Sequence, residues 1–330
     1  IEPFFLRIFL YDCRAGHRLS EEFRIDPNSD DLTAMLKIGG KNGIGKNLAE
    51  KSTLEEDGVN TLSQQILANK NVRKVMYSIS KPHPDIYLIV RVDRLLSIDT
   101  SAEVYMKNDL KGVAKLQKII QQTYSKATQD RMPFAWAARP VFQEMSGCGT
   151  KLSNKMQLYR CEGNKLGDGD LQKILVDFGR IEKSGKLTQL PAATVTMNID
   201  FSPKASELSM RINSSFMPVR PWNAASDSLG SACFEAQSFN DFVVEPHTSF
   251  FNLLYVYPLT LKYDSQKSFN KARNIVCTVR FISASRKEDM SQVIYNRFGS
   301  PKPFVHSMRC SVQYHEQNPV FSDEVFLATN

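Results

Sequence analysis

The chain has few cysteines, and their spacing favours neither a metal site nor a disulfide framework. Its 330 residues include six cysteines, and no two of them form a CxxC pair. Structural zinc sites and disulfide-rich domains both need closely and regularly spaced cysteines. We therefore expect buried, reduced thiols.

Long apolar runs are also absent. No stretch reaches the roughly 18 consecutive apolar residues of a membrane-spanning helix, and the first residues lack the basic region and cleavage site of a signal peptide. Yet 42% of the residues are apolar, and the chain is long enough for two ordinary domains with their own cores. These features predict a folded cytoplasmic protein.

A complete catalytic motif is missing as well. Gly40, Gly45 and Lys46 have the spacing of a phosphate-binding loop, but Asn47 stands where a Ser or Thr hydroxyl should hold magnesium. None of the five histidines has a second metal ligand at a suitable offset, and no serine, histidine and acid can be combined without arbitrary choices. A flexible surface loop at 40–46 is the better interpretation, and we predict no catalytic residue, metal or cofactor.

Strand-like patterns dominate what is present. Alternating residues predict strands at 4–11 and 194–201, and strand character is also expected at 86–92 and around a buried Trp136. Apolar residues spaced near 3.6 predict an amphipathic helix over 109–129. A second, shorter helix is expected over 168–178, with Asp168 or Asp170 as its N-cap. The pattern indicates a mainly β protein with a few helices.

Composition suggests a division into two domains. We expect a β-rich α+β domain over 1–201 that contains the helix at 109–129. Residues 202–246 are rich in Ser, Pro and Asn with little periodicity, which indicates a linker or a long, strand-bearing connection. The second domain is expected over 247–330.

The positive charge is concentrated in the second domain. The whole chain carries a net charge of +7, and residues 262–309 hold ten Lys and Arg against three acids. Between the strand-like runs at 253–263 and 275–281, a polar loop contains Lys267, Lys271 and Arg273 with Asp264 as its one acid. A solvated face would explain such a segment, but a loop at the tip of a sandwich also suits a charged head group.

Several residue runs identify a family. TyrValTyrPro at 255–258, LeuLysTyrAspSerGlnLysSerPhe at 261–269 and LysAlaArgAsnIle at 271–275 resemble the start of the first Dock homology region, the C2-like lipid-binding domain of dedicator-of-cytokinesis guanine nucleotide exchange factors. ArgMetProPheAlaTrpAlaAlaArg at 131–139 resembles the segment that precedes this domain, and TyrHisGluGlnAsnProValPhe at 314–321 resembles a later part of it. The match is closest to the zizimin branch.

The resemblance implies a fold and a site. It implies that 247–330 is the N-terminal part of a C2-like antiparallel β-sandwich that continues past Asn330, so that the sandwich is truncated here. It also implies that Lys267 and Arg273, with Lys271 between them, contact a phosphoinositide head group. Arg286 and Lys287 in the next connection are added as further lipid-binding residues. The scarcity of Asp in these loops argues against a calcium site, which needs six to eight oxygen ligands.

The function that follows is membrane targeting and scaffolding within an exchange factor for Rho-family GTPases of the Rac or Cdc type. In this family a separate downstream region performs the exchange, so the fragment itself is expected to bind without catalysing, with peripheral recruitment from the cytoplasm and oligomers possible in the parent protein. The alternative is a sandwich module whose basic face meets an acidic protein or nucleic acid. Nucleic acid is disfavoured because Phe269 is the one aromatic residue between Asp264 and Arg273.

Overall fold

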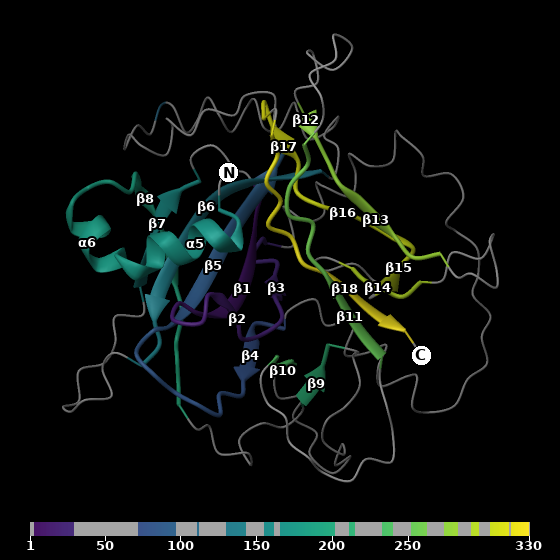
Figure 1. Cartoon of the computed structure of the whole chain (residues 1–330), viewed down its shortest axis with the longest axis horizontal. Coiled ribbons are helices and arrows are strands. Elements are labelled where there is room, and N and C mark those ends of the chain that lie inside the picture. Colours follow the sequence, from purple (N-terminus) through teal and green to yellow (C-terminus); the bar gives the residue numbers. More distant parts are fainter. Residues whose placement is uncertain are drawn as a thin grey trace.

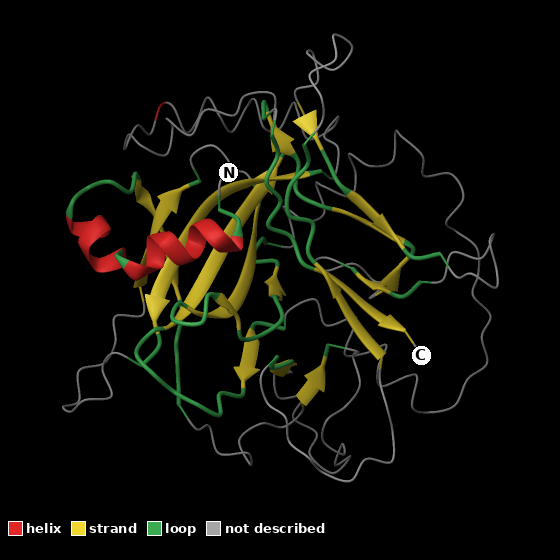
Figure 2. Ribbon diagram, viewed as in Figure 1, coloured by secondary structure: helices red, strands yellow, loops and turns green. Residues whose placement is uncertain are grey.

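The computed structural model describes thirteen parts of the chain, and every structural statement below concerns these residues: 3–29, 72–96, 111, 130–142, 155–161, 166–201, 211–214, 233–239, 252–262, 274–282, 292–296, 304–316 and 318–329. Strands dominate these parts, and helices cover one side of the largest sheet (Figures 1 and 2). The predicted fold class, mainly β with a few helices, is confirmed.

The largest sheet has seven strands, all paired in antiparallel fashion. Its order is β2-β1-β5-β6-β7-β8, and β3 also pairs with β1. The strands are β1 (Phe4–Asp12), β2 (His17–Arg18), β3 (Phe23–Ile25), β5 (Ile86–Leu95), β6 (Arg131–Pro140), β7 (Lys155–Arg160) and β8 (Gln189–Thr196).

Both faces of this sheet are covered, because its central strands are apolar on both sides. On one face Ile8 and Val90 belong to a core cluster, and on the other Phe9 and Trp136 belong to a second one. The helices α5 (Asp168–Val176) and α6 (Phe178–Lys183) supply buried residues to the second cluster. The expected burial of Trp136 is therefore confirmed, with 2% of the residue exposed.

A tight turn joins β1 to β2. Gly16 adopts a positive φ of 75°, a conformation that side chains with a Cβ rarely adopt. A Cβ on Gly16 would also lie 2.6 Å from Nε2 of Gln172 on α5, so the turn and the helix are in close contact. The pairing of Asp12 with His17 and of Ile8 with Phe23 makes this part of the chain a hairpin.

A second, parallel sheet joins distant parts of the sequence. Its order is β4-β10-β9, with β4 at Lys74–Tyr77, β10 at Cys233–Ala236 and β9 at Arg211–Asn213. Phe23, Ile212 and Phe234 form its core. Two of these strands fall in the segment at 202–246 that we interpret as a linker or strand-bearing connection.

The third unit is an antiparallel β-sandwich in the C-terminal part. One layer has the order β11-β18-β14-β15, and the facing layer consists of the pairs β12–β17 and β13–β16. Both layers contribute to one core that includes Ile294, Met308 and Leu327. The strands are β11 (Asn252–Val256), β12 (Asn274–Ile275), β13 (Thr278–Arg280), β14 (Ile294–Tyr295), β15 (Phe304–Val305), β16 (Ser307–Arg309), β17 (Gln313–Tyr314) and β18 (Val325–Thr329).

Some predictions of single helices and strands are confirmed, and others are wrong or lie outside the described residues. The helix expected over 168–178 is confirmed as α5, but its predicted N-cap is wrong: Gly167 occupies the cap, and neither Asp168 nor Asp170 caps the helix with its side chain. The strand expected at 194–201 ends at Thr196 and begins earlier, at Gln189. The helix expected at 109–129 lies outside the described residues except for Lys111, and so does the near-motif at 40–46. The five described cysteines are free thiols.

Candidate functional site

The basic residues that the sequence singles out lie outside the described parts of the chain. Lys267, Lys271 and Arg273 fall within 263–273, and Arg286 and Lys287 fall within 283–291. The structure does describe the residues on either side of both segments. These flanks show where each segment leaves and rejoins the sandwich.

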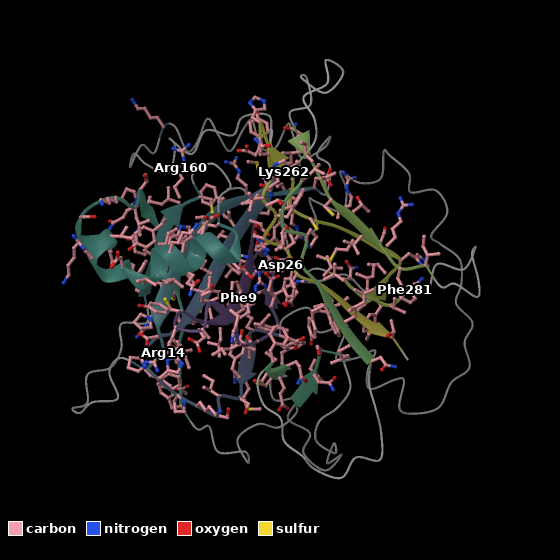
Figure 3. All side chains as sticks on the ribbon, in the orientation of Figure 1. Phe9, Arg14, Asp26, Arg160, Lys262 and Phe281 are labelled. Atoms are coloured by element: carbon pink, nitrogen blue, oxygen red, sulfur yellow. The ribbon has the colours of Figure 1, made fainter. Side chains whose placement is uncertain are left out.

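The first basic segment begins and ends at the same end of the sandwich. Before it, the backbone N–H of Leu261 donates to the carbonyl of Pro319 at 3.1 Å. After it, Asn274 pairs with Tyr314 in the short β12–β17 ladder. Figure 1 shows β12 and β17 together at the top of the molecule, and Lys262 is labelled beside them in Figure 3.

The second basic segment, 283–291, follows the far end of the path that β12 and β13 form. The chain runs through β12 and β13 from Asn274 to Ile282. In the middle of this path, the backbone N–H of Cys310 donates a hydrogen bond to the carbonyl of Cys277 and so joins the path to the neighbouring strand. At about 3.3 Å per residue this path spans roughly 26 Å. Phe281 accordingly lies far from Lys262 in Figure 3. Joint action of Arg286 and Lys287 with Lys267 thus stays a prediction, without support from these flanks.

Two basic side chains near these flanks are exposed. Lys262 and Arg280 have no ion-pair partner among the described residues. Arg309, by contrast, forms an ion pair with Asp130, in which Nε of Arg309 lies 3.1 Å from Oδ1 of Asp130. The part of the sandwich that the structure describes therefore keeps positive charge available to an anionic partner.

The strongest electrostatic feature is a buried cluster between the large sheet and the sandwich, which we call the junction cluster. Its arginines come from four strands of the large sheet, and its acids come from both units. The members are Arg7, Arg18, Glu22, Arg24, Arg91, Asp93, Asp168, Asp323 and Glu324. All are buried except Asp168, which is half-buried.

Within the junction cluster Arg7 and Asp93 form the most deeply buried pair. Nη2 of Arg7 donates to Oδ1 of Asp93 at 3.0 Å, and Nε lies 2.9 Å from Oδ2. Arg18 holds Asp168 with two donors, at 2.9 and 3.2 Å. Asp168 therefore anchors the first turn of α5 through its side chain to β2.

One backbone carbonyl accepts hydrogen bonds from three of the arginines. The carbonyl oxygen of Ser322, in the turn before β18, accepts from Arg91 at 2.7 Å, from Arg7 at 3.1 Å and from Arg18 at 3.3 Å. The adjoining cavity measures about 10 Å³ and is lined by Arg7, Arg91 and Asp93, among others. A space of this size holds at most one water molecule, so the residues around Ser322 occupy the rest of the space between these arginines.

Glu324 continues the contact on the neighbouring side. Its Oε1 accepts from the backbone N–H of Glu22 at 2.8 Å, and its Oε2 accepts from the hydroxyl of Tyr257 at 2.7 Å. The guanidinium of Arg24 donates to the backbone carbonyl of Glu324. Turn 322–324 is thus bound by the large sheet through both backbone and side-chain groups.

Burial and charge shift several pKa values in the junction cluster. Burial alone would lower the pKa of Arg7, but the carboxylates of Asp93, Glu22 and Asp323 raise it overall. Burial and the neighbouring Arg18 lower the pKa of Arg91 to about 10. Burial opposes ionisation of Asp168, yet Arg18 and Arg91 hold its pKa below the usual value. Arg7 and Arg91 stay charged at neutral pH, and a buried ion network of this kind depends on every partner.

Among the described residues, no group of three or more His, Cys, Asp or Glu side chains is arranged to hold a metal ion. Within the same ranges no helix is long and apolar enough to cross a membrane.

Residues 247–328 match the family model described as the C2 domain in Dock180 and Zizimin proteins. Dedicator of cytokinesis protein 9 of Homo sapiens is 35% identical over 337 residues, which cover 98% of this chain and 16% of that protein. Over nearly its whole length the chain is similar to dedicator-of-cytokinesis proteins.

Further relatives refine this assignment. Dedicator of cytokinesis protein 11 of Danio rerio is 34% identical over 336 residues, again covering 98% of the chain and 16% of the relative. Human dedicator of cytokinesis protein 8 is 24% identical over 381 residues, with coverages of 98% and 17%. The higher identity to proteins 9 and 11 agrees with the predicted zizimin branch. The chain spans about a sixth of the length of these relatives.

The junction cluster is the part of this segment that the sequence analysis missed. A signal was present, because Arg91 and Asp93 interrupt an apolar strand at alternate positions and Arg7 does the same in β1. Charges on a strand whose two faces are both covered must be paired. The partners in 322–324 lie more than 200 residues away, and no local pattern indicates them.

Proposed function

We propose that this segment recruits its parent protein to phosphoinositide-bearing membranes through the basic segment 263–273. The observation that carries the proposal is the position of its flanks, Leu261 and Asn274, at one end of the sandwich next to the exposed Lys262. From Lys262 to Arg273 the chain holds four basic residues and one acid, a net charge of +3. Basic side chains near an anionic leaflet contribute about 1 kcal/mol each, which suffices for reversible binding.

The junction cluster supports a scaffold role beside this binding role. A rigid connection between the large sheet and the sandwich would hold the basic end in a fixed orientation to the rest of the parent protein. The proposed partners are the membrane surface and, through a region outside this segment, a Rho-family GTPase. Nucleotide exchange on that GTPase is proposed as an activity of the parent protein, and none is expected of residues 1–330 alone.

The test is co-sedimentation of the chain with phosphatidylcholine vesicles, with and without a phosphoinositide, and DNA binding measured in parallel. We expect the phosphoinositide to increase sedimentation and added salt to reduce it, because exposed charges are screened. Equal sedimentation with both vesicle types, together with salt-dependent DNA binding, would favour the interaction-module alternative. Nucleotide release from Rac- and Cdc-type GTPases, measured with the same chain, should match the rate without it.

A further inference from the structure

Two leucines next to the basic segment are exposed on a short ribbon. Leu259 is 64% exposed and Leu261 is 41% exposed. Single exposed apolar side chains are common and need no explanation. Among the large apolar side chains that the described ranges leave exposed, these are the one pair two residues apart. A pair at this spacing on an extended chain projects from the same side.

The backbone of this ribbon is fixed by pairing. The carbonyl of Leu259 accepts from the N–H of Phe321 at 2.8 Å, and the N–H of Leu261 donates to the carbonyl of Pro319 at 3.1 Å. Phe321 belongs to the sandwich core and is 5% exposed. The two leucines are therefore presented by a rigid scaffold that leads directly into Lys262.

A stacked pair of rings, half-buried Tyr314 and exposed His315, lies at the same end of the sandwich. His315 has a positive φ of 53°, which is uncommon for a residue with a side chain. Its ring stacks on that of Tyr314, with centroids 4.0 Å apart and planes 9° apart. Tyr314 ends β17 and lies five residues before Pro319, whose carbonyl accepts from Leu261, so the rings and the leucine ribbon share one end of the sandwich, where Figure 3 labels Lys262. We call Leu259, Leu261, Lys262, Tyr314 and His315 the leucine rim.

We propose that the leucine rim inserts into the surface of an anionic bilayer. Leu259 and Leu261 enter the boundary between head groups and acyl chains, and Tyr314 and His315 lie at the level of the head groups. Amphipathic rings favour that level, and interfacial binding increases with the apolar area buried plus the attraction to anionic lipid. This inference rests on the proposed membrane binding and adds the means by which the sandwich is held there.

Charge and size favour a bilayer over a protein partner. Lys262 adjoins a segment with a net positive charge, which matches an anionic surface. Two leucines and a ring pair are far smaller than the roughly 800 Å² that each partner contributes to a stable protein interface. They suffice to add to electrostatic attraction, because each buried leucine strengthens partitioning by about tenfold.

The experiment uses the whole chain and vesicles of phosphatidylcholine, phosphatidylserine and a phosphoinositide. Leu259→Ser with Leu261→Ser should weaken vesicle binding by about a hundredfold, on the estimate of about tenfold per leucine. Leu254→Ser is the matched control, because Leu254 is 50% exposed on β11, away from the rim, and should bind as the unaltered chain does. In a second measurement, the fluorescence of Leu261→Trp should be quenched by lipids brominated on their acyl chains, and that of Leu254→Trp should not.

The outcomes separate this inference from the proposed function. Unchanged binding of the double serine variant and no quenching at position 261 would contradict the insertion of the leucine rim. Loss of binding on Lys267→Ala with Arg273→Ala would still support membrane binding by the basic segment. Absence of any binding by the unaltered chain overturns both. If the double serine variant is a monomer where the unaltered chain is a dimer, and vesicle binding is unchanged, the leucines contact a second copy of the chain. The proposed insertion of the leucine rim would then be wrong.

Discussion

The hydroxyl of Tyr255 on β11 donates a hydrogen bond to Oε2 of Glu21 at 3.0 Å. Oε1 of the same carboxyl group accepts from the backbone N–H of Gln237 at 2.8 Å. Glu21 therefore joins the turn after β2, the residues that follow β10, and the sandwich. Burial raises the pKa of this carboxyl group to about 7, since no arginine lies within ion-pair distance of it in the part of the chain that the structure describes.

Stability should fall with rising pH because of Glu21. Its pKa rises from 4.5 in the unfolded chain to about 7 in the folded one, so the folded state holds a proton that the unfolded state has lost. The contribution is fully present below about pH 4.5 and is lost as the pH rises to about 7, a change of up to about 3 kcal/mol.

Glu21→Gln should remove this part of the pH dependence. The amide resembles the protonated carboxyl group and has no charge to bury, so the variant should be at least as stable as the unaltered chain at pH 8. Urea unfolding at several pH values checks the difference between the two proteins. Parallel curves for both would show that Glu21 does not titrate in this range.

Removing one partner from the junction cluster should be costly. Asp93→Ala removes the carboxylate that lies 2.9 Å from Nε of Arg7 and leaves this buried guanidinium with the more distant Glu22 and Asp323. Breaking a buried pair in this way costs about 3–5 kcal/mol. Asp85→Ala is the matched control, because its pair with Arg14 is exposed and about 1 kcal/mol or less is expected. Urea midpoints measure both, and equal losses would contradict the assigned burial.

Gly16 tests the contact between the first turn and α5. Gly16→Ala should destabilise the fold by about 2 kcal/mol, because it adds strain at a positive φ to a clash with Gln172. Gly185→Ala separates the two causes, since Gly185 also has a positive φ of 68° but nothing lies within 4 Å of its added Cβ. A smaller loss at Gly185 is expected in thermal unfolding, and a loss as large as that at Gly16 would assign the whole effect to the backbone.

Local pattern predicted the strands and α5 because their signals lie within a few residues. The alternation around Phe9 gives a strand covered on both faces, and the apolar spacing from Leu171 to Leu175 gives a helix. The N-cap was predicted wrongly for a tertiary reason. Arg18, 150 residues away, binds both oxygens of Asp168, and that pairing outweighs a local hydrogen bond to the helix N-terminus.

Pairing between distant segments could not be predicted. The parallel sheet joins Val75 to Phe234, and the junction cluster joins Arg7 to Ser322, across more than 150 and 300 residues. Periodicity describes which face of a strand is buried, but not which segment buries it. The basic residues at 263–273, by contrast, were identified from sequence alone, and their role remains a prediction.

The role of the basic segment is tested most directly by Lys267→Ala with Arg273→Ala. The double variant should bind phosphoinositide vesicles about 2 kcal/mol more weakly, at about 1 kcal/mol per basic residue near the surface, with unchanged thermal unfolding. Lys173→Ala with Arg180→Ala on the helices is the matched control, because it removes the same charge from exposed positions. Arg91 is unsuitable for this purpose, since it is buried in the junction cluster. Equal binding by both double variants would show that net charge, and not the segment 263–273, attracts the chain to the membrane.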